Sequence, residues 1–219
     1  MSSEAIILDS TERTTFHRRP QRGSYERAVI DAVLDAGVIC QVGYVLDGTP
    51  RVLPTIYWRT GDAVYWHGSR EGFGLKAMAG AEVCFSVTIL DGLVMARSAF
   101  HHSANYRSVM AYGRPEAIED DVAKMAALRE MFDKIYPGRW GEIRKPSRAE
   151  LAATLVLRLE LTEATAKARA GGPIDAKGDL TQPGWAGVIP VALVAGAPIQ
   201  AEDLKPGGAA LDVPGWLGG

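Results

Sequence analysis

Alternating apolar and polar residues run through the middle of the chain and predict β-strands. Between Val83 and Ile89 every second side chain is apolar and points to one face, while Cys84, Ser86 and Thr88 point to the other. The same period of two returns over residues 105–113 and over residues 154–162, where four leucines share one face. These three segments are predicted strands with one buried and one more polar face.

Two turn sequences divide the preceding apolar stretch into a meander of three strands. They are Asp47-Gly48-Thr49-Pro50 and Thr60-Gly61-Asp62. The predicted strands cover residues 38–46, 51–59 and 63–67. Pro54 cannot donate a hydrogen bond to a neighbouring strand, so it predicts an edge or a bulge at that point.

A polar loop is predicted between the two strongest strands. Asp91-Gly92 is a turn signal that ends the first of them. Titratable and polar groups packed this densely between core strands are costly to hold in place, which indicates a site. The loop carries Arg97, His101, His102, Ser103 and Asn105.

Four segments have the apolar spacing or the capping residues of helices. They cover residues 25–36, 71–79, 120–136 and a shorter stretch after Ser147. Ser24 is predicted to cap the first and Gly37 to end it. Ser147 and Glu150 have the spacing of a capping box. The predicted buried face of the third helix is Ala123, Ala126, Ala127, Met131 and Ile135.

Many short strands with hairpin turns and few helices favour a mainly β fold, a closed or partly closed β-barrel with peripheral helices. No βαβ series occurs, which argues against a Rossmann sheet. We predict an N-terminal arm over 1–23, the barrel domain over 24–193 and an irregular tail over 194–219. The arm is basic around Pro20, and it is either a solvated segment or one that wraps a second subunit or touches a ligand phosphate. Its cations are Arg18, Arg19 and Arg22.

Composition narrows the class of protein further. The 219 residues carry a formal net charge of −2, which gives no sign of a nucleic-acid partner. No apolar run approaches the roughly 20 residues of a membrane span, and the N-terminus lacks a secretion signal. Cys40 and Cys84 lie in apolar runs, so we expect free thiols. A soluble cytoplasmic protein is therefore predicted.

A group that could bind phosphate follows the third predicted strand. His67, Gly68 and Ser69 end that strand, and Lys76 follows on a short helix. Backbone N–H groups, a hydroxyl and a cation together suit a phosphate, although Lys76 as a solvated lysine and His67 as a strand-end tie remain alternatives. His101 and His102 are adjacent and would point in opposite directions on a strand, so we predict no metal site. No G-x-S-x-G motif points to a hydrolase.

Four longer runs of sequence carry a resemblance to a known family. They are RRPQRGSYERAVIDAVLDAG, VLPTIYWRTGDAVYWHGS, TILDGLVMARSAFHHSANYRSVMAYG and WAGVIPV. The chain resembles the pyridoxamine 5'-phosphate oxidase-like flavin-nucleotide-binding proteins, and within them the branch with the nitroimidazole-resistance proteins. The resemblance runs from about Arg18 to about Pro190. The chain lacks the arginine-and-lysine phosphate signature and the C-terminal Arg-x-His of true pyridoxamine phosphate oxidases. Their absence argues against vitamin B6 oxidation.

The resemblance implies an FMN-binding split β-barrel that works as a homodimer with two cofactor sites between the subunits. Pro54 and Thr55 would lie along the flavin ring, with Thr88 on the neighbouring strand. The phosphate or the ring edge would be surrounded by His67, Gly68, Ser69 and Lys76. From the facing subunit the flavin would be reached by Tyr106, Arg107 and Ser108. His67 takes the position of the branch's proposed reactive residue.

Two kinds of function follow from this resemblance, and a structural dimer that has lost its ligand is a third alternative. One is a flavin-dependent oxidoreductase that acts on a small organic molecule, possibly with NAD(P)H, the flavin supplying the redox chemistry. The other is a module that binds or stores flavin or haem without turnover. FMN is the expected cofactor, and FAD, haem or a deazaflavin are the less favoured ones.

Overall fold

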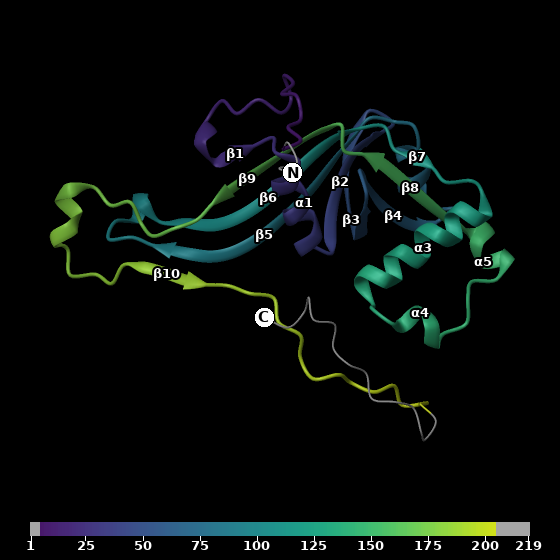
Figure 1. The fold of residues 1–219 in the computed structure, drawn as a ribbon. Coiled ribbons are helices and arrows are strands. Elements are labelled where there is room, and N and C mark those ends of the chain that lie inside the picture. The colour runs from purple at the N-terminus through teal and green to yellow at the C-terminus, as the bar shows by residue number, and fades with distance from the viewer. Residues whose placement is uncertain (1–4, 205–219) are drawn as a thin grey trace.

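The computed structural model describes residues 5–204, and its centre is a curled antiparallel sheet (Figure 1). The sheet has ten strands, in the order β1-β9-β6-β5-β2-β3-β4-β8-β7, with β10 paired to β5. The strands are β1 (Gly23–Ser24), β2 (Ile39–Leu46), β3 (Thr49–Thr60), β4 (Ala63–Ser69), β5 (Val83–Met95), β6 (Ser103–Gly113), β7 (Glu116–Ala117), β8 (Thr154–Glu160), β9 (Glu163–Arg169) and β10 (Gly187–Pro190). The predicted mainly β fold, a partly closed barrel with peripheral helices, is confirmed.

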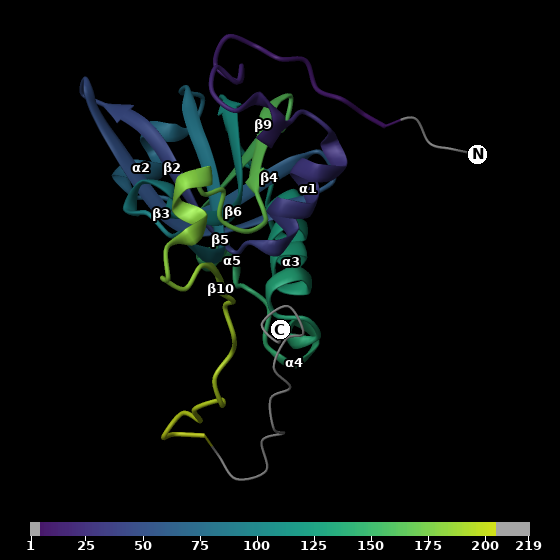
Figure 2. The ribbon, with the colours of Figure 1, turned by 90° about the vertical axis from the view of Figure 1, so that its left-hand side faces the viewer.

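The helices lie around this sheet and are short except for α3. Figure 2 shows α1 beside the curl and α3 below it, on the side of α4. They are α1 (Arg27–Ala36), α2 (Phe73–Met78), α3 (Asp121–Ile135), α4 (Arg139–Glu142) and α5 (Arg148–Ala153), with the 3-10 turns η1 (Pro20–Arg22), η2 (Ala99–His101) and η3 (Lys177–Thr181). No helix in residues 5–204 is long and apolar enough to cross a membrane.

The main core fills the inside of the curl. Strand alternation brings Val42, Phe85 and Val87 to this side, and the four leucines of the 154–162 segment join them as predicted. Helices α1 and α2 close the core, because their apolar stripes are buried in it. Buried apolar area of this kind is the main term that stabilises such a fold.

A second, smaller core lies on the outer face of the sheet. Trp58 of β3 and Val156 of β8 point outward there and pack against α3 and α5. Helix α3 buries Ala127, Met131 and Ile135 as predicted. The strand pair β3–β4 is therefore buried on both faces, which places the side chains of its outer face inside the protein.

The predicted buried face of α3 is corrected at two of its five positions. Ala123 and Ala126 are exposed, and Lys124 and Leu128 are buried in their place. Lys124 is tolerated because its ammonium donates a hydrogen bond to the carbonyl of Leu151, 3.2 Å away. The buried face of α3 is therefore rotated relative to the predicted one. Periodicity alone assigns a lysine to the solvent side, whereas the contact with Leu151 allows Lys124 to be buried.

The first predicted hairpin is confirmed, and so is the edge position of Pro54. Asp47 and Gly48 both have positive φ, as a tight two-residue hairpin turn requires. Pro54 pairs with Gln41 of β2, whereas β4 pairs only with the far end of β3, over 57–60. The other side of β3 is therefore unpaired at Pro54, and the missing N–H breaks no ladder.

The turn predicted at Asp91-Gly92 is wrong, because β5 runs on to Met95. The ladder to β6 shifts its register between Leu90 and Gly92, so the two residues form a bulge within a long hairpin. Asp91 is held there by Arg107 of β6, at 2.7 Å. Gly92 is needed because a Cβ would lie 3.0 Å from the carbonyl of Ile189 in β10.

The predicted helix cap at Ser24 is also wrong. Helix α1 begins at Arg27, and Ser24 instead pairs with Ala166 of β9. The Ser24 hydroxyl accepts a hydrogen bond from the amide of Glu26, and the amide of Arg27 donates to the carbonyl of Ile6. These pairings keep the chain extended before the helix. Gly37 ends α1 as predicted, and Ser147 and Glu150 form the predicted capping box at α5.

Both cysteines are free thiols, as predicted, and they differ in burial. Cys40 is fully buried in the main core, where burial raises the pKa of its thiol to about 12. Cys84 is half-buried, and burial raises the pKa of its thiol as well. Neither thiol has the lowered pKa of a reactive cysteine.

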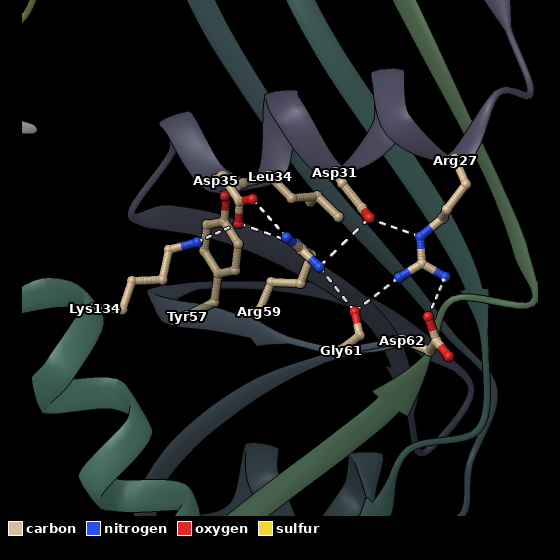
Figure 3. Close-up of polar contacts among 9 residues, drawn as sticks. All are labelled: Arg27, Asp31, Leu34, Asp35, Tyr57, Arg59, Gly61, Asp62 and Lys134. Atoms are coloured by element: carbon tan, nitrogen blue, oxygen red, sulfur yellow. Dashed lines mark hydrogen bonds and ion pairs between the residues drawn. The ribbon is translucent and has the colours of Figure 1, made fainter. Parts of the chain in front are cut away.

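A network of charged side chains joins α1 to the turn between β3 and β4 and to α3 (Figure 3). Arg59 of β3 contacts Asp35 at 2.5 Å, and Lys134 of α3 contacts the same carboxylate at 2.5 Å. Arg27 contacts Asp31 within α1 at 2.7 Å. The network couples three elements that are far apart in the sequence.

Candidate functional site

His67 lies on β4 and points to the outer face of the sheet, toward α3. Along this strand Val64 and Trp66 enter the main core, whereas Tyr65 and His67 lie on the other side. Tyr65 and His67 therefore share one face of the strand, as the alternation of residues 63–67 requires. Across the ladder His67 faces Val156 of β8. The histidine is thus set between the sheet and the helical layer.

A cavity of about 610 Å³ opens beside His67, between the sheet and the helices α3 to α5. Its walls are mainly apolar and aromatic, as is typical of sites for small molecules and cofactors. Phe132 holds two of the rings together, with centroid distances of 5.4 Å to Tyr136 and 5.2 Å to Trp140. The lining side chains are Ile56, His67, Leu128, Met131, Phe132, Tyr136, Trp140, Ile143, Arg144, Pro146, Glu150 and Thr154.

The imidazole of His67 has no hydrogen-bond partner in the described residues. Its Nδ1 atom is buried and unpaired, and its ring lies 5.9 Å from that of Trp58. Burial lowers the pKa of His67, so the imidazole is neutral at neutral pH. A tie from His67 to a neighbouring carbonyl, the structural alternative considered above, is absent. A buried nitrogen without a partner costs free energy, which makes it a candidate ligand group.

One ion pair lies at the rim of this cavity. Arg144 binds Glu150 in a bidentate manner, with both N–O distances 2.7 Å. The hydrogen bond from Arg144 is the main reason why the pKa of Glu150 lies well below its usual range. The guanidinium is mostly exposed, so the rim carries this paired cation and anion beside mainly apolar walls.

The residues next to His67 in the predicted phosphate group point elsewhere. Gly68 packs against Leu75 of α2, where a Cβ would come within 3.2 Å of that side chain. The Ser69 hydroxyl accepts a hydrogen bond from the amide of Glu71, and Lys76 is paired to the carboxylate of Glu71 at 2.6 Å. None of Gly68, Ser69 and Lys76 lines the His67 cavity.

The other residues implied by the resemblance are spread along β3, β5 and β6. Pro54 and Thr55 lie on the open edge of β3. Thr88 faces Ser108 across the β5–β6 ladder. Their flavin-binding roles, and the sharing of this site with a second subunit, stay predictions.

Three neighbouring residues of β6 serve two different faces of the sheet. Ser108 donates a hydrogen bond to the carbonyl of Lys167 at 3.1 Å. Arg107 lies on the α1 side, where it lines a cavity of about 370 Å³. Tyr106 lies on the opposite side, in a basic cavity. Alternation therefore separates Arg107 from its two neighbours.

That second cavity, the basic cavity, has a volume of about 540 Å³ and lies between η1, η2 and the end of β9. It brings the basic N-terminal arm together with the polar loop that sequence analysis singled out. It is lined by Arg18, Arg19, Arg22, Phe100, His101, His102, Ser103, Tyr106, Lys167, Arg169 and Ile174.

The two adjacent histidines of the loop are oriented by Ser98. His101 Nδ1 lies 2.7 Å from the Ser98 hydroxyl, and His102 Nδ1 lies 2.9 Å from the Ser98 carbonyl oxygen. His101 is also 3.8 Å from Asp179. Within residues 5–204 no group of three or more histidine, cysteine or acidic side chains is placed to hold a metal ion.

The family model described as pyridoxamine 5'-phosphate oxidase matches residues 26–168. The split-barrel architecture and this match define the class, and the chain belongs to the pyridoxamine 5'-phosphate oxidase-like family. No curated protein matches the chain.

Two solved structures are similar over nearly the whole chain. One is the flavocytochrome Anf3 from Azotobacter vinelandii, with 39% sequence identity, a TM-score of 0.87, and coverage of 94% of this chain and 95% of that one. The other is described as an FAD and haem binding protein from Mycobacterium smegmatis, with 39% identity, a TM-score of 0.82, and coverage of 89% and 95%.

A candidate 5-nitroimidazole antibiotic resistance protein from Bacteroides thetaiotaomicron is more distant. It has 23% identity, a TM-score of 0.53, and coverage of 64% of this chain and 82% of that one. This likeness shows the fold alone, so membership of the nitroimidazole-resistance branch stays a prediction.

Sequence reasoning missed most of the walls around His67. Leu128, Phe132 and Trp140 come from α3 and α4, more than 60 positions after His67 in the chain. The available signal was the amphipathic pattern of 120–136, which predicts a buried face but not the strand it covers. The contact between this helix and the outer face of β3 and β4 is set by the tertiary structure, which periodicity does not predict.

Proposed function

We propose that this chain is a redox protein that binds a flavin together with a haem, the haem lying in the His67 cavity. The observation that carries the proposal is a neutral, unpartnered histidine on the wall of a large apolar cavity. The two similar structures with 39% identity support it, because one is a flavocytochrome and the other is described as binding FAD and haem.

The residues present fit a haem. An imidazole nitrogen commonly binds haem iron, and His67, which lines the cavity and makes no side-chain hydrogen bond among the described residues, would offer its ring for this. Met131, Phe132 and Trp140 would contact an apolar macrocycle. When bound, such a group supplies one-electron exchange, and a flavin supplies hydride and electron transfer.

The chain itself would orient the imidazole of His67, exclude water from one side of it and keep it in its neutral form. Strand β4 fixes the imidazole, and the second core of Trp58 and Leu128 keeps water from its inner side. Since the pKa of His67 is lowered, the ring needs no deprotonation before it binds a metal at neutral pH. His67 is therefore proposed as a ligand rather than as the proton donor or acceptor of the reaction.

The flavin site is proposed to lie between two subunits, on the residues that the resemblance implies. The similar protein from Mycobacterium smegmatis is described as binding FAD, which favours FAD over the predicted FMN. A small organic molecule and NAD(P)H remain the proposed reaction partners. An FAD with the haem in the same chain suits the passage of electrons from a two-electron donor to a one-electron acceptor.

The absorption spectrum tests this proposal. Protein purified from cells supplied with haem precursor is expected to show a Soret band together with flavin bands, and NADPH is expected to bleach the flavin bands under anaerobic conditions. Titration of colourless protein with FAD, FMN and haemin separates the cofactors. Protein that binds no flavin in any titration would refute the flavin part, and protein that binds flavin but no haemin would refute the haem part.

We also propose a homodimer. One face of the three strands β5, β6 and β10 exposes apolar side chains. Residues 192–200 extend away from the body and make no backbone hydrogen bond to the described chain (Figure 1). Such exposed apolar surface marks an interaction site. The exposed side chains are Leu90, Leu93, Met110, Ile189, Leu193, Val194 and Ile199.

Light scattering at micromolar protein is expected to give twice the 23.5 kDa chain mass. The double change Leu193→Asp and Val194→Asp should shift the mass toward the monomer, because it places charge on apolar contact surface. As a matched control, Val122→Asp changes an exposed apolar residue of α3 on another face. A monomeric wild type would contradict the proposed dimer.

A further inference from the structure

We infer that the basic cavity binds the phosphate groups of a dinucleotide, as found in FAD or NADPH. The inference rests on the proposed function, since it assigns part of a cofactor or electron donor to a second site of the chain. Its first basis is charge: the walls bring together five cations from the N-terminal arm and β9. They are Arg18, Arg19, Arg22, Lys167 and Arg169.

These cations are not neutralised by the protein. Most arginines in the described part of the chain form an ion pair with a carboxylate. None of the five cations in the basic cavity has such a pair within residues 5–204, although they lie side by side. Like charges held together repel one another, so an anion between them would be strongly favoured.

Arg169 gives the strongest evidence, because it is only 8% exposed. Its guanidinium donates to the side-chain oxygen of Asn105 and to the carbonyls of Gly171, at 3.1 Å, and Gly172, at 3.0 Å. All these partners are neutral. These neutral acceptors supply no counter-ion, and burying a guanidinium without one is costly.

The arm also has an uncommon backbone conformation at Arg19, which lines this cavity. Arg19 has φ 57 and ψ 54, a left-handed conformation that is rare for a residue with a side chain, and Pro20 follows it. Strain of this kind persists where surrounding contacts require it. Lys167 helps to fix the arm, since its ammonium lies 3.4 Å from the carbonyl oxygen of Arg18.

The cavity also offers flat rings and a connection to the predicted flavin residues. Phe100 is 90% exposed and stands edge-on to His101, so one aromatic face is free for a base. In the ladder Tyr106 faces Arg169 and Ser108 faces Lys167, so these side chains share one sheet face. Thr88 faces Ser108 and joins them. A dinucleotide could therefore run from this face into the basic cavity.

The test removes cations from the arm and compares ligands that differ in phosphate. The variants are Arg19→Gly, which tolerates the left-handed backbone, and Arg22→Ala. The matched controls are Arg51→Ala and Arg148→Ala, which remove exposed arginines that also lack an ion pair among the described residues. Calorimetry measures the affinities of FAD, NADPH, riboflavin and sodium pyrophosphate at low salt.

The expected result is about tenfold or greater loss of affinity for FAD, for NADPH or for both in each arm variant, with no loss in the controls. Pyrophosphate should follow the same order, and riboflavin should bind all proteins alike. Loss for FAD alone assigns the cavity to the flavin, and loss for NADPH alone assigns it to the electron donor.

Failure of the inference can be told from failure of the proposed function. Equal affinities of every phosphate ligand for wild type, arm variants and controls would overturn the inference, even if the wild type binds FAD and haem. If the wild type binds no flavin, the proposed function fails, and NADPH and pyrophosphate still decide whether the basic cavity binds phosphate. Raising the salt concentration should weaken the cavity-dependent part of each affinity.

Discussion

Substitution of His67 by glycine is expected to weaken haem binding by about a hundredfold or more, since loss of groups that merely orient a ligand already costs about ten- to a hundredfold. His67 is the histidine on the walls of the apolar cavity, and its Nδ1 has no partner in the described residues. Removal of the side chain leaves the apolar walls but no ligand for iron. Haemin titration followed at the Soret band measures the loss.

Free imidazole gives the sharpest check of this expectation. In the glycine variant the space vacated by the side chain can hold an imidazole, which restores an axial nitrogen. The Soret position and the haemin affinity should therefore recover as imidazole is added, whereas wild type should show little change. A glycine variant that binds haemin as tightly as wild type would show that His67 is not the ligand.

Substitution of His67 by leucine separates a ligand role from a structural one. An unpaired buried nitrogen stabilises nothing through hydrogen bonding, so an apolar side chain of similar size should keep or raise the free energy of unfolding. Thermal unfolding of the cofactor-free protein measures this. A leucine variant with normal haemin binding and a lowered melting temperature would favour the structural reading over the proposed one.

Strand alternation predicted which face His67 occupies, but not what covers that face. The period of two places Tyr65 and His67 together, and the structure confirms it. Whether such a face meets solvent, a second subunit or a helix depends on contacts remote in sequence. The family resemblance implies that His67 lies near a flavin, and the fold of this chain places α3 and α4 beside it, where they form an open, mainly apolar cavity.

Other errors also have causes that lie far away in the sequence. Asp91-Gly92 has turn chemistry, yet the ladder to β6 and the pairing with β10 hold it within a long strand as a bulge. Strand β9 was missed because its alanines and Lys167 give little hydrophobic contrast, and β9 becomes a strand only by pairing with β6 and β1. Whether these segments form strands depends on the strands with which they pair. A single sequence does not reveal those partners.

The basic arm shows how much a composition signal can and cannot predict. Arg18, Arg19 and Arg22 were recognised as a cluster that could touch a phosphate. Their neighbours Lys167 and Arg169 lie about 150 residues later, in a strand that periodicity did not reveal. The cluster becomes a candidate site only when the sheet brings both halves together.

Substitution of Arg59 by methionine is expected to destabilise the fold by about 1.5–3 kcal/mol, the range for hydrogen bonds that involve charged groups. Arg59 is 17% exposed in its side chain and donates to both oxygens of Asp35, at 3.0 and 2.5 Å (Figure 3). It also donates to the carbonyl of Gly61 at 2.8 Å. Methionine keeps the aliphatic volume, so the loss reports the polar contacts. Denaturant unfolding measures it.

The matched control is Arg129→Met in α3. Arg129 also pairs with an aspartate, Asp133, but at 3.5 Å and with a side chain 65% exposed. Such a pair contributes about 0.3–0.5 kcal/mol on a helix surface. Equal losses in the two variants would mean that the network around Asp35 adds nothing beyond an ordinary surface pair.

The pH dependence of the Arg59 effect provides an independent check with a defined sign. Burial acts to raise the pKa of Asp35, but the hydrogen bonds from Arg59 and Lys134 lower it on balance. A carboxyl whose folded pKa is lowered contributes stability that is present above the unfolded value of about 3.9 and is lost as the pH falls through the folded value. The stability gap between wild type and Arg59→Met should therefore be full at pH 6 and shrink as the pH falls below about 4. A gap that stays constant from pH 6 to pH 3 would place the contribution of Arg59 in its packing and its bond to Gly61, not in its pairing with Asp35.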